Sequence, residues 1–244
     1  HDMGNYLTFL VNDGVFKSDT LLQPKTFKKL FEPHSFLGTT GTYPTNALTK
    51  PNWNTYGLGW FQQDYKGHKL DFHTGSLFGL IALAGIIHDK DLAVYVFANL
   101  DHAELRHAIM YKTMDLFAFN DDGRDWHTEV FNLYQGFKKE GIEKVKKDEA
   151  ERVKNTKPSL PLLDYEGTYK NKMLGSVQVA LLNGKLQINF NEFITYSAEH
   201  WHYDTFITNK DPRFYKKLKV NFDLNEAGKS SRLNIMGEVF IKKK

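Results

Sequence analysis

Cysteine is absent from the 244-residue sequence, which excludes disulfides, thiolate nucleophiles and zinc–thiolate sites. Long apolar runs are missing too. The longest, from Leu77 to Ile87, is interrupted by Gly79 and Gly85 and is too short to span a bilayer, so it reads as a buried strand with its turn. An excess of charge is also lacking, because a formal net charge of +3 is too small and dispersed to indicate a nucleic-acid-binding protein.

The composition that is present is typical of a folded protein. Hydrophobic residues make up 41% and charged residues 25%, and the length fits one large or two modest domains. The chain opens at His1 without an initiator methionine, on a predicted helix that Asp2 would cap. We therefore expect an upstream segment, which would have carried any targeting signal.

The first part of the chain alternates helical and strand signals. Helices are predicted from Met3 to Val11 and from Gln23-Pro24 to about Phe31, followed by a long loop over residues 34–55. Short turns then separate four apolar segments, which predict an antiparallel meander: Tyr56–Gln63, Lys69–His73, Leu80–His88 and Leu92–Asn99. Two further helices are predicted, at His102–Phe119 and at about Asp125–Lys154, the second ending in many charges.

Pro158 to Pro161 marks a predicted domain boundary, after which short alternating strands recur. The turn Asn183-Gly184 is a strong hairpin signal. The seven predicted strands are Gly167–Lys170, Ser176–Leu182, Lys185–Phe190, His200–Thr208, Lys216–Leu224, Arg232–Met236 and Val239–Lys242. The predicted fold class is α+β: an antiparallel sheet with flanking helices over residues 1–135, a charged helix and linker over 136–160, and a small all-β, barrel-like domain over 161–244.

Two neighbouring segments carry the chemical signal: Tyr56-Gly57-Leu58-Gly59-Trp60, and His73-Thr74-Gly75-Ser76-Leu77-Phe78-Gly79. His-Thr-Gly alone is a tripeptide with many chance matches. On its own it fits a half-buried strand histidine with Gly75 in a β-bulge. In this order, each before an antiparallel strand, the two segments are considerably more specific.

Together they resemble the region around the third conserved motif of class C β-lactamases, penicillin-binding proteins and related esterases. Many members have Lys-Thr-Gly there, and some have His-Thr-Gly as in this chain. The resemblance covers about residues 1–135, with further similarity at Asp2-Met3, residues 21–26, Phe31-Glu32-Pro33-His34 and Arg124-Asp125-Trp126. It implies part of the serine β-lactamase/DD-peptidase fold and an acyl-enzyme reaction without metal or organic cofactor.

The resemblance also implies roles for the motif residues. His73 would supply positive or donor character near the substrate carboxylate, and Thr74 would hydrogen-bond that carboxylate. Gly75 would let the backbone approach closely, and the N–H of Ser76 would be an oxyanion donor. Tyr56 and Phe78 would complete the substrate-binding wall.

The sequence departs from the family at the nucleophile. None of its serines is followed three residues later by lysine, so the Ser-x-x-Lys motif is absent. The match Tyr169-Lys170-Asn171 to the second motif follows the third motif and reads as chance. The chain alone is therefore expected to be inactive. The partner it implies is a complementary N-terminal half of the same precursor, or a second copy, covering apolar sheet surface left exposed.

The C-terminal segments Asp164–Tyr169, Asn183–Leu186 and His200–Phe206 resemble the lipocalin-like domain appended to many β-lactamase-like hydrolases. His200 and His202 alternate on a predicted strand, so either a metal site or simple packing beside Trp201 is open. Two further functions stay open for the chain: a non-catalytic protein that binds a peptide or lipid-like ligand, and a structural assembly module. The family resemblance favours a periplasmic or extracellular location.

Overall fold

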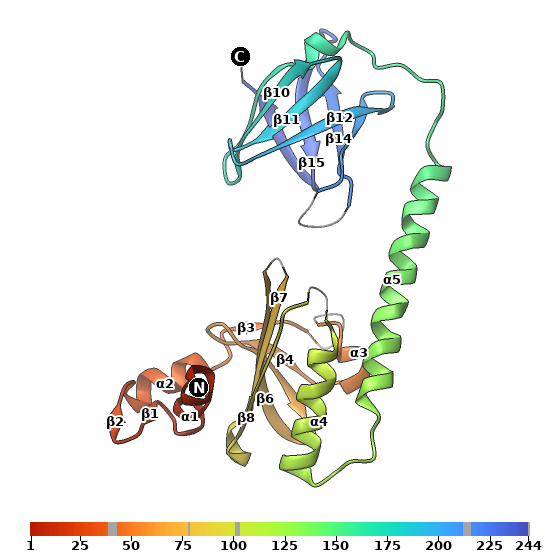
Figure 1. Ribbon diagram of the computed structural model, residues 1–244. Coiled ribbons are helices and arrows are strands. Elements are labelled where there is room, and N and C mark those ends of the chain that lie inside the picture. The colour runs from red at the N-terminus through yellow and green to blue at the C-terminus, as the bar shows by residue number, and fades with distance from the viewer. Residues whose placement is uncertain (39–42, 78, 101–102, 212–215, 244) are drawn as a thin grey trace. The chain divides into compact units, whose positions relative to one another are not determined.

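The computed structural model describes residues 1–38, 43–77, 79–100, 103–211 and 216–243. It divides into two compact units, residues 1–142 and residues 143–244, whose positions relative to one another are not determined (Figure 1). The sequence places domain boundaries at residues 135/136 and 160/161, on either side of this division. Among the described helices, none has the length and hydropathy that crossing a membrane requires.

A six-stranded antiparallel sheet organises the first unit. Strands adjacent in sequence are adjacent in space, so the predicted meander is correct, and the order is β3 (Ser35–Phe36), β4 (Asn54–Tyr56), β5 (Phe61–Tyr65), β6 (His68–Leu77), β7 (Leu80–Ile87) and β8 (Leu92–Ala98). The predicted strand Tyr56–Gln63 is wrong. It is the end of β4, a tight turn in which Gly59 takes a φ of 88°, and the start of β5.

The segment expected to be a long loop contains two short strands and a one-turn helix, and its residues 39–42 lie outside the described part. The helices of this unit are α1 (Asp2–Val11), α2 (Pro24–Leu30), α3 (Asn46–Thr49), α4 (Leu105–Phe119) and the first part of α5 (Trp126–Ala150), which continues past residue 142. A small hairpin pairs β1 (Val15–Phe16) with β2 (Asp19–Thr20). Asp2 lies in the first turn of α1 behind the N-cap residue His1, so it is not the predicted cap.

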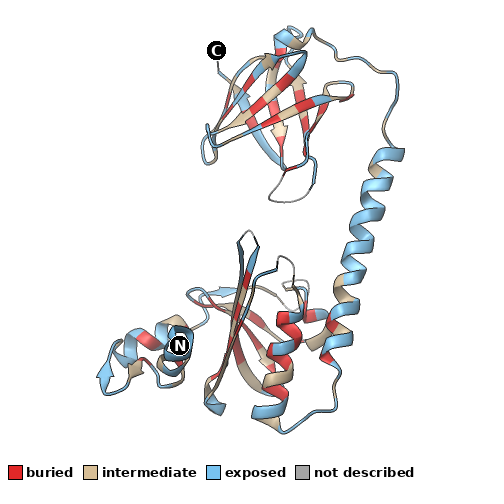
Figure 2. Cartoon of the chain, in the orientation of Figure 1, coloured by how far each residue is buried: buried red, intermediate tan, exposed pale blue. Residues whose placement is uncertain are grey.

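The sheet is covered on both faces. Buried residues lie along α4 and at the start of α5 (Figure 2). Phe72, Leu83 and Met114 share one core with Trp126 of α5. A second core joins Leu10 of α1 and Phe27 of α2 to Trp60 and Ile86. We expected this second face to be exposed. Helices α1 and α2 cover part of it, because their apolar side chains pack against it. The last strand β8 is an edge strand and leaves Phe97 61% exposed.

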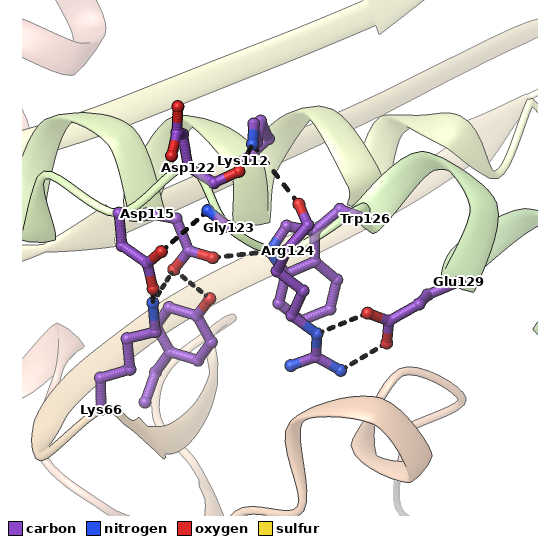
Figure 3. A network of polar contacts seen from close by, with 10 residues as sticks. Lys66, Lys112, Asp115, Asp122, Gly123, Arg124, Trp126 and Glu129 are labelled. Atoms are coloured by element: carbon purple, nitrogen blue, oxygen red, sulfur yellow. Dashed lines mark hydrogen bonds and ion pairs between the residues drawn. The ribbon is translucent and has the colours of Figure 1, made fainter.

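A buried carboxylate ties β5 to both long helices (Figure 3). Asp115 on α4 accepts hydrogen bonds from the hydroxyl of Tyr65 at 2.6 Å and from Nε1 of Trp126 at 2.7 Å. Nζ of Lys66 lies 2.6 Å from the same carboxylate. Arg124 stacks on the ring of Trp126 at 3.8 Å. This network fixes the start of α5 against the end of α4.

The second unit is a closed eight-stranded antiparallel barrel, one strand more than predicted. After a 3-10 turn at Leu162–Tyr165, its strands are β9 (Gly167–Asn171), β10 (Gly175–Leu182), β11 (Lys185–Phe190), β12 (Ile194–His202), β13 (Thr205–Thr208), β14 (Lys219–Leu224), β15 (Ser230–Ile235) and β16 (Glu238–Lys242). The hairpin at Asn183-Gly184 is confirmed, since Leu182 pairs with Lys185. Buried side chains such as Tyr169, Tyr196 and Phe240 fill the barrel core.

Trypsin is expected to cut the native chain first between Lys144 and Lys157 and to release a folded barrel. Lys146 and Lys147 are exposed on the charged half of α5, whereas the barrel strands are tied into a closed sheet. Mass spectrometry of early digestion products and circular dichroism of the purified fragment measure this. First cuts within residues 165–240 would contradict a two-domain organisation.

Candidate functional site

Strand β6 carries the whole His73–Ser76 motif. Its pairing with β7 is continuous, with Thr74 opposite Leu83 and Gly75 opposite Ala82. Gly75 is therefore part of the regular ladder and not of a bulge. Pairing of β6 with β5 ends at Phe72, so residues 73–77 extend beyond their neighbour on that side. The motif thus lies on a projecting strand whose second edge has no strand partner among the described residues.

His73 and Tyr56 come together as expected for two residues of one site. The hydroxyl of Tyr56 lies 3.1 Å from Nε2 of His73, and the imidazole stacks on Phe61 at 5.4 Å. Burial lowers the pKa of His73, and a hydrogen bond to the Thr74 backbone offsets this in part. His73 is therefore a neutral imidazole at neutral pH, and the positive character expected from the sequence is not favoured by its surroundings. Phe78, the other predicted substrate contact, lies outside the described residues.

Thr74 belongs to a polar chain that sequence reasoning missed. Its Oγ1 lies 3.0 Å from the hydroxyl of Tyr43, and that hydroxyl lies 2.7 Å from Nε2 of His107. Nδ1 of His107 lies 3.0 Å from the backbone oxygen of Glu104. Tyr43 is 31 residues before Thr74, and His107 is on α4. Only the packing of α4 against the sheet brings these residues together.

Arg106 sits beside this chain. Its guanidinium is buried, and Nη2 lies 3.2 Å from Oε2 of Glu104. Burial raises the pKa of Tyr43, while Thr74 and the charge of Arg106 lower it by smaller amounts. Tyr43 is therefore a protonated hydroxyl throughout the neutral range.

A cavity of about 420 Å³ borders the motif strand. His73, Thr74 and Gly75 line it together with apolar side chains of other elements, which include Leu58, Trp60 and Tyr95. A larger cavity, of about 620 Å³, lies between α4 and residues 122–127 and does not contain the motif. We place the candidate site at the smaller cavity, because three consecutive residues of the motif line it.

The described residues contain no cluster of three or more His, Cys, Asp or Glu side chains placed to hold a metal ion. The two histidines of the barrel make local contacts instead. Nε2 of His200 lies 2.9 Å from the oxygen of Tyr203, and Nδ1 of His202 accepts from the N–H of Val153 at 3.3 Å. The strand register also shifts between them, so their side chains are not held as a simple alternating pair.

Comparisons with known proteins give one family match and several structural similarities. The profile of a family described as a domain of unknown function, DUF3471, matches residues 151–242. None of the curated proteins is a significant match. Among solved structures, the C-terminal domain of penicillin binding protein Rv0907 is 25% identical and has a TM-score of 0.31, with 38% of this chain and 94% of that chain covered.

Two longer structures are similar over most of the chain. The octameric penicillin-binding protein homologue from Pyrococcus abyssi is 16% identical, with a TM-score of 0.38, and the match covers 99% of this chain and 46% of that one. SurE, solved with D-Leu, is 16% identical, with a TM-score of 0.32, and the match covers 91% of this chain and 44% of that one. The chain thus spans less than half the length of both. TM-scores of this size do not establish a shared fold, so the function is argued from the site.

Proposed function

We propose that residues 1–142 form the substrate-side wall of a β-lactamase-related serine hydrolase, which acts on D-alanyl peptides, β-lactams or small esters through an acyl-enzyme. The observation that carries the proposal is the projecting strand of residues 73–77, which borders a cavity of about 420 Å³ and has one edge that no described strand pairs with. A strand with a free edge can align an acyl group by backbone hydrogen bonds, as oxyanion stabilisation requires.

The motif residues take the following roles in this proposal. The N–H of Ser76 is an oxyanion donor, and Gly75 keeps the strand surface open because no side chain lies above it. His73, held by Tyr56 and Phe61, borders the reacting group as a neutral imidazole. Thr74 contacts the part of the substrate beyond the scissile bond.

The nucleophile and its base come, in this proposal, from a polypeptide segment outside these 244 residues, since no serine here precedes a lysine by three positions. The exposed edge of β8 with Phe97 is the surface on which such a segment, or a second copy, would pair. A periplasmic or extracellular location and the absence of a cofactor belong to the same proposal.

A second candidate function rests on the same free edge. A strand without a partner on one side can accept an extended peptide by β-augmentation, without any chemistry. The chain would then be a peptide-binding protein. The two functions differ in whether the native assembly turns over an acyl substrate.

The isolated chain is expected to bind N-acetyl-D-alanyl-D-alanine at the motif without forming a covalent adduct. Amide resonances of Gly75 and Ser76 should shift on titration, and His73→Ala should weaken binding about 10-fold through a lost hydrogen bond. His68→Ala is the control, because His68 is at the other end of β6 and pairs with Asp89. NMR titration gives the affinities, and intact mass after treatment with penicillin or a fluorophosphonate gives acylation.

Two results would contradict this picture. Motif amides that do not move during the titration would place the substrate site elsewhere. Stoichiometric acylation of any serine would show that the chain carries its own nucleophile.

A further inference from the structure

The hydrogen bonds that join Thr74, Tyr43 and His107 behind the motif have donors and acceptors that chemistry determines. Nδ1 of His107 lies 3.0 Å from the backbone oxygen of Glu104 and 3.5 Å from its carboxylate oxygen Oε2. Both oxygens can only accept hydrogen bonds, so Nδ1 carries the proton of the neutral ring. Nε2 is then unprotonated and can only accept, which makes the Tyr43 hydroxyl, 2.7 Å away, the donor to it.

This first step decides the next. The Tyr43 hydroxyl has one hydrogen, which it donates in its hydrogen bond to Nε2 of His107. The Tyr43 oxygen therefore faces Thr74 Oγ1, at 3.0 Å, as an acceptor, and the Thr74 hydroxyl must donate its own hydrogen to Tyr43. Thr74 is only partly buried, so the remaining lone pairs of its oxygen are open to a donor on a substrate.

The surroundings hold His107 neutral. Its side chain is fully buried, and burial followed by the charge of Arg106 lowers its pKa to about 4, with the Glu104 backbone acting in the opposite sense. The other titratable groups that face it are Glu104, Tyr43 and Tyr134, whose ring stacks on the imidazole at 5.8 Å. Burial also raises the pKa of Tyr134, so this hydroxyl stays protonated.

We infer that Thr74 is a hydrogen-bond acceptor in this site and that the site therefore selects substrates with an amide N–H next to the scissile group over substrates that end in a free carboxylate. The inference rests on the proposed function, whose substrate it specifies. It replaces the expectation from sequence that Thr74 donates to a carboxylate. The neutral state of His73 acts in the same direction, because no positive charge is then available there for a carboxylate.

Two probes of nearly equal size, one uncharged and one negatively charged, test this selection. At pH 7, N-acetyl-D-alaninamide should bind the intact chain about five-fold tighter than N-acetyl-D-alanine, since the amide can donate to Thr74 and the carboxylate cannot. Tyr43→Phe frees the Thr74 hydroxyl to donate, so the ratio of the two affinities should fall to one or below. Thr74→Val should also abolish the preference.

Tyr111→Phe is the matched control, because it removes a buried hydroxyl that bonds Thr45 and Gln63 instead of this chain. The ratio should stay at its wild-type value. A tighter carboxylate than amide in the wild type, or an unchanged ratio in Tyr43→Phe, would overturn the inference.

The order of the hydrogen bonds can be measured without any ligand. Nitrogen NMR of the histidine side chains should show His107 protonated on Nδ1 alone at pH 7. A proton on Nε2 would overturn the inference whatever the probes do. If neither probe binds, the proposed function fails. The NMR result for His107 still shows separately whether Thr74 donates its hydrogen to Tyr43.

Discussion

Replacing Asp115 with alanine is expected to lower the free energy of unfolding of the first unit by about 3–5 kcal/mol. The carboxylate is 1% exposed and accepts from the Tyr65 hydroxyl at 2.6 Å and from Trp126 Nε1 at 2.7 Å. Without it, two buried donors lose their acceptor, and Lys66 loses its shorter ion pair (Figure 3). The structural consequence is a loosened junction between α4 and α5.

Chemical denaturation followed by tryptophan fluorescence measures the loss, because Trp126 is buried against this carboxylate. Asp121→Ala is the control. Asp121 pairs with the same Lys66 at 2.7 Å, but half of its side chain is in solvent, so removing it should lower the free energy of unfolding much less than removing Asp115. Equal losses for the two variants would show that Asp115 is not the junction's main polar contact.

Local sequence signals predicted the elements that have clear turns. Asn183-Gly184 gave the correct hairpin because both residues take positive φ angles easily, 50° and 75° here. The missed strand β12 shows the opposite case. The turn between β12 and β13 places Tyr203 at a φ of 46°, a conformation for which tyrosine gives no signal. The prediction therefore ran one strand from His200 to Thr208 across a real turn.

The candidate site also has a part that local sequence signals predict and a part that they do not. His73, Thr74, Gly75 and Ser76 are consecutive on one strand, so a motif could predict that they act together. Tyr43 lies in a segment expected to be a loop, and His107 lies on a helix with no polar pattern of its own. His107 reaches Thr74 only through the Tyr43 hydroxyl, and this arrangement depends on how α4 packs over β7 and β8, which no local spacing encodes. The sequence motif therefore names the strand residues of the candidate site and not Tyr43 and His107 behind them.

Acid should weaken the first unit by about 2–3 kcal/mol between pH 7.5 and pH 4.5, through His107. Its pKa is about 4 in the folded protein and near 6.5 when unfolded. In this range the unfolded chain binds a proton that the native chain does not, so stability is fully present above pH 6.5 and is lost as pH falls toward 4. His88, also with a pKa of about 4, acts in the same direction, while Asp71, whose pKa burial raises, opposes it.

The test separates His107 from the other titrating groups. His107→Gln removes the ionisation while leaving Asp71 and His88 in place, so the variant should be less stable at pH 7.5 but lose about 2–3 kcal/mol less on acidification than the wild type. Denaturation curves at both pH values, with the barrel transition as internal reference, give the two losses. Identical losses would show that His107 takes up its proton in the folded state. Tyr43 would then have to accept from Nε2 and turn its hydrogen to Thr74, so acid and the Tyr43→Phe substitution should shift the probe preference in the same direction.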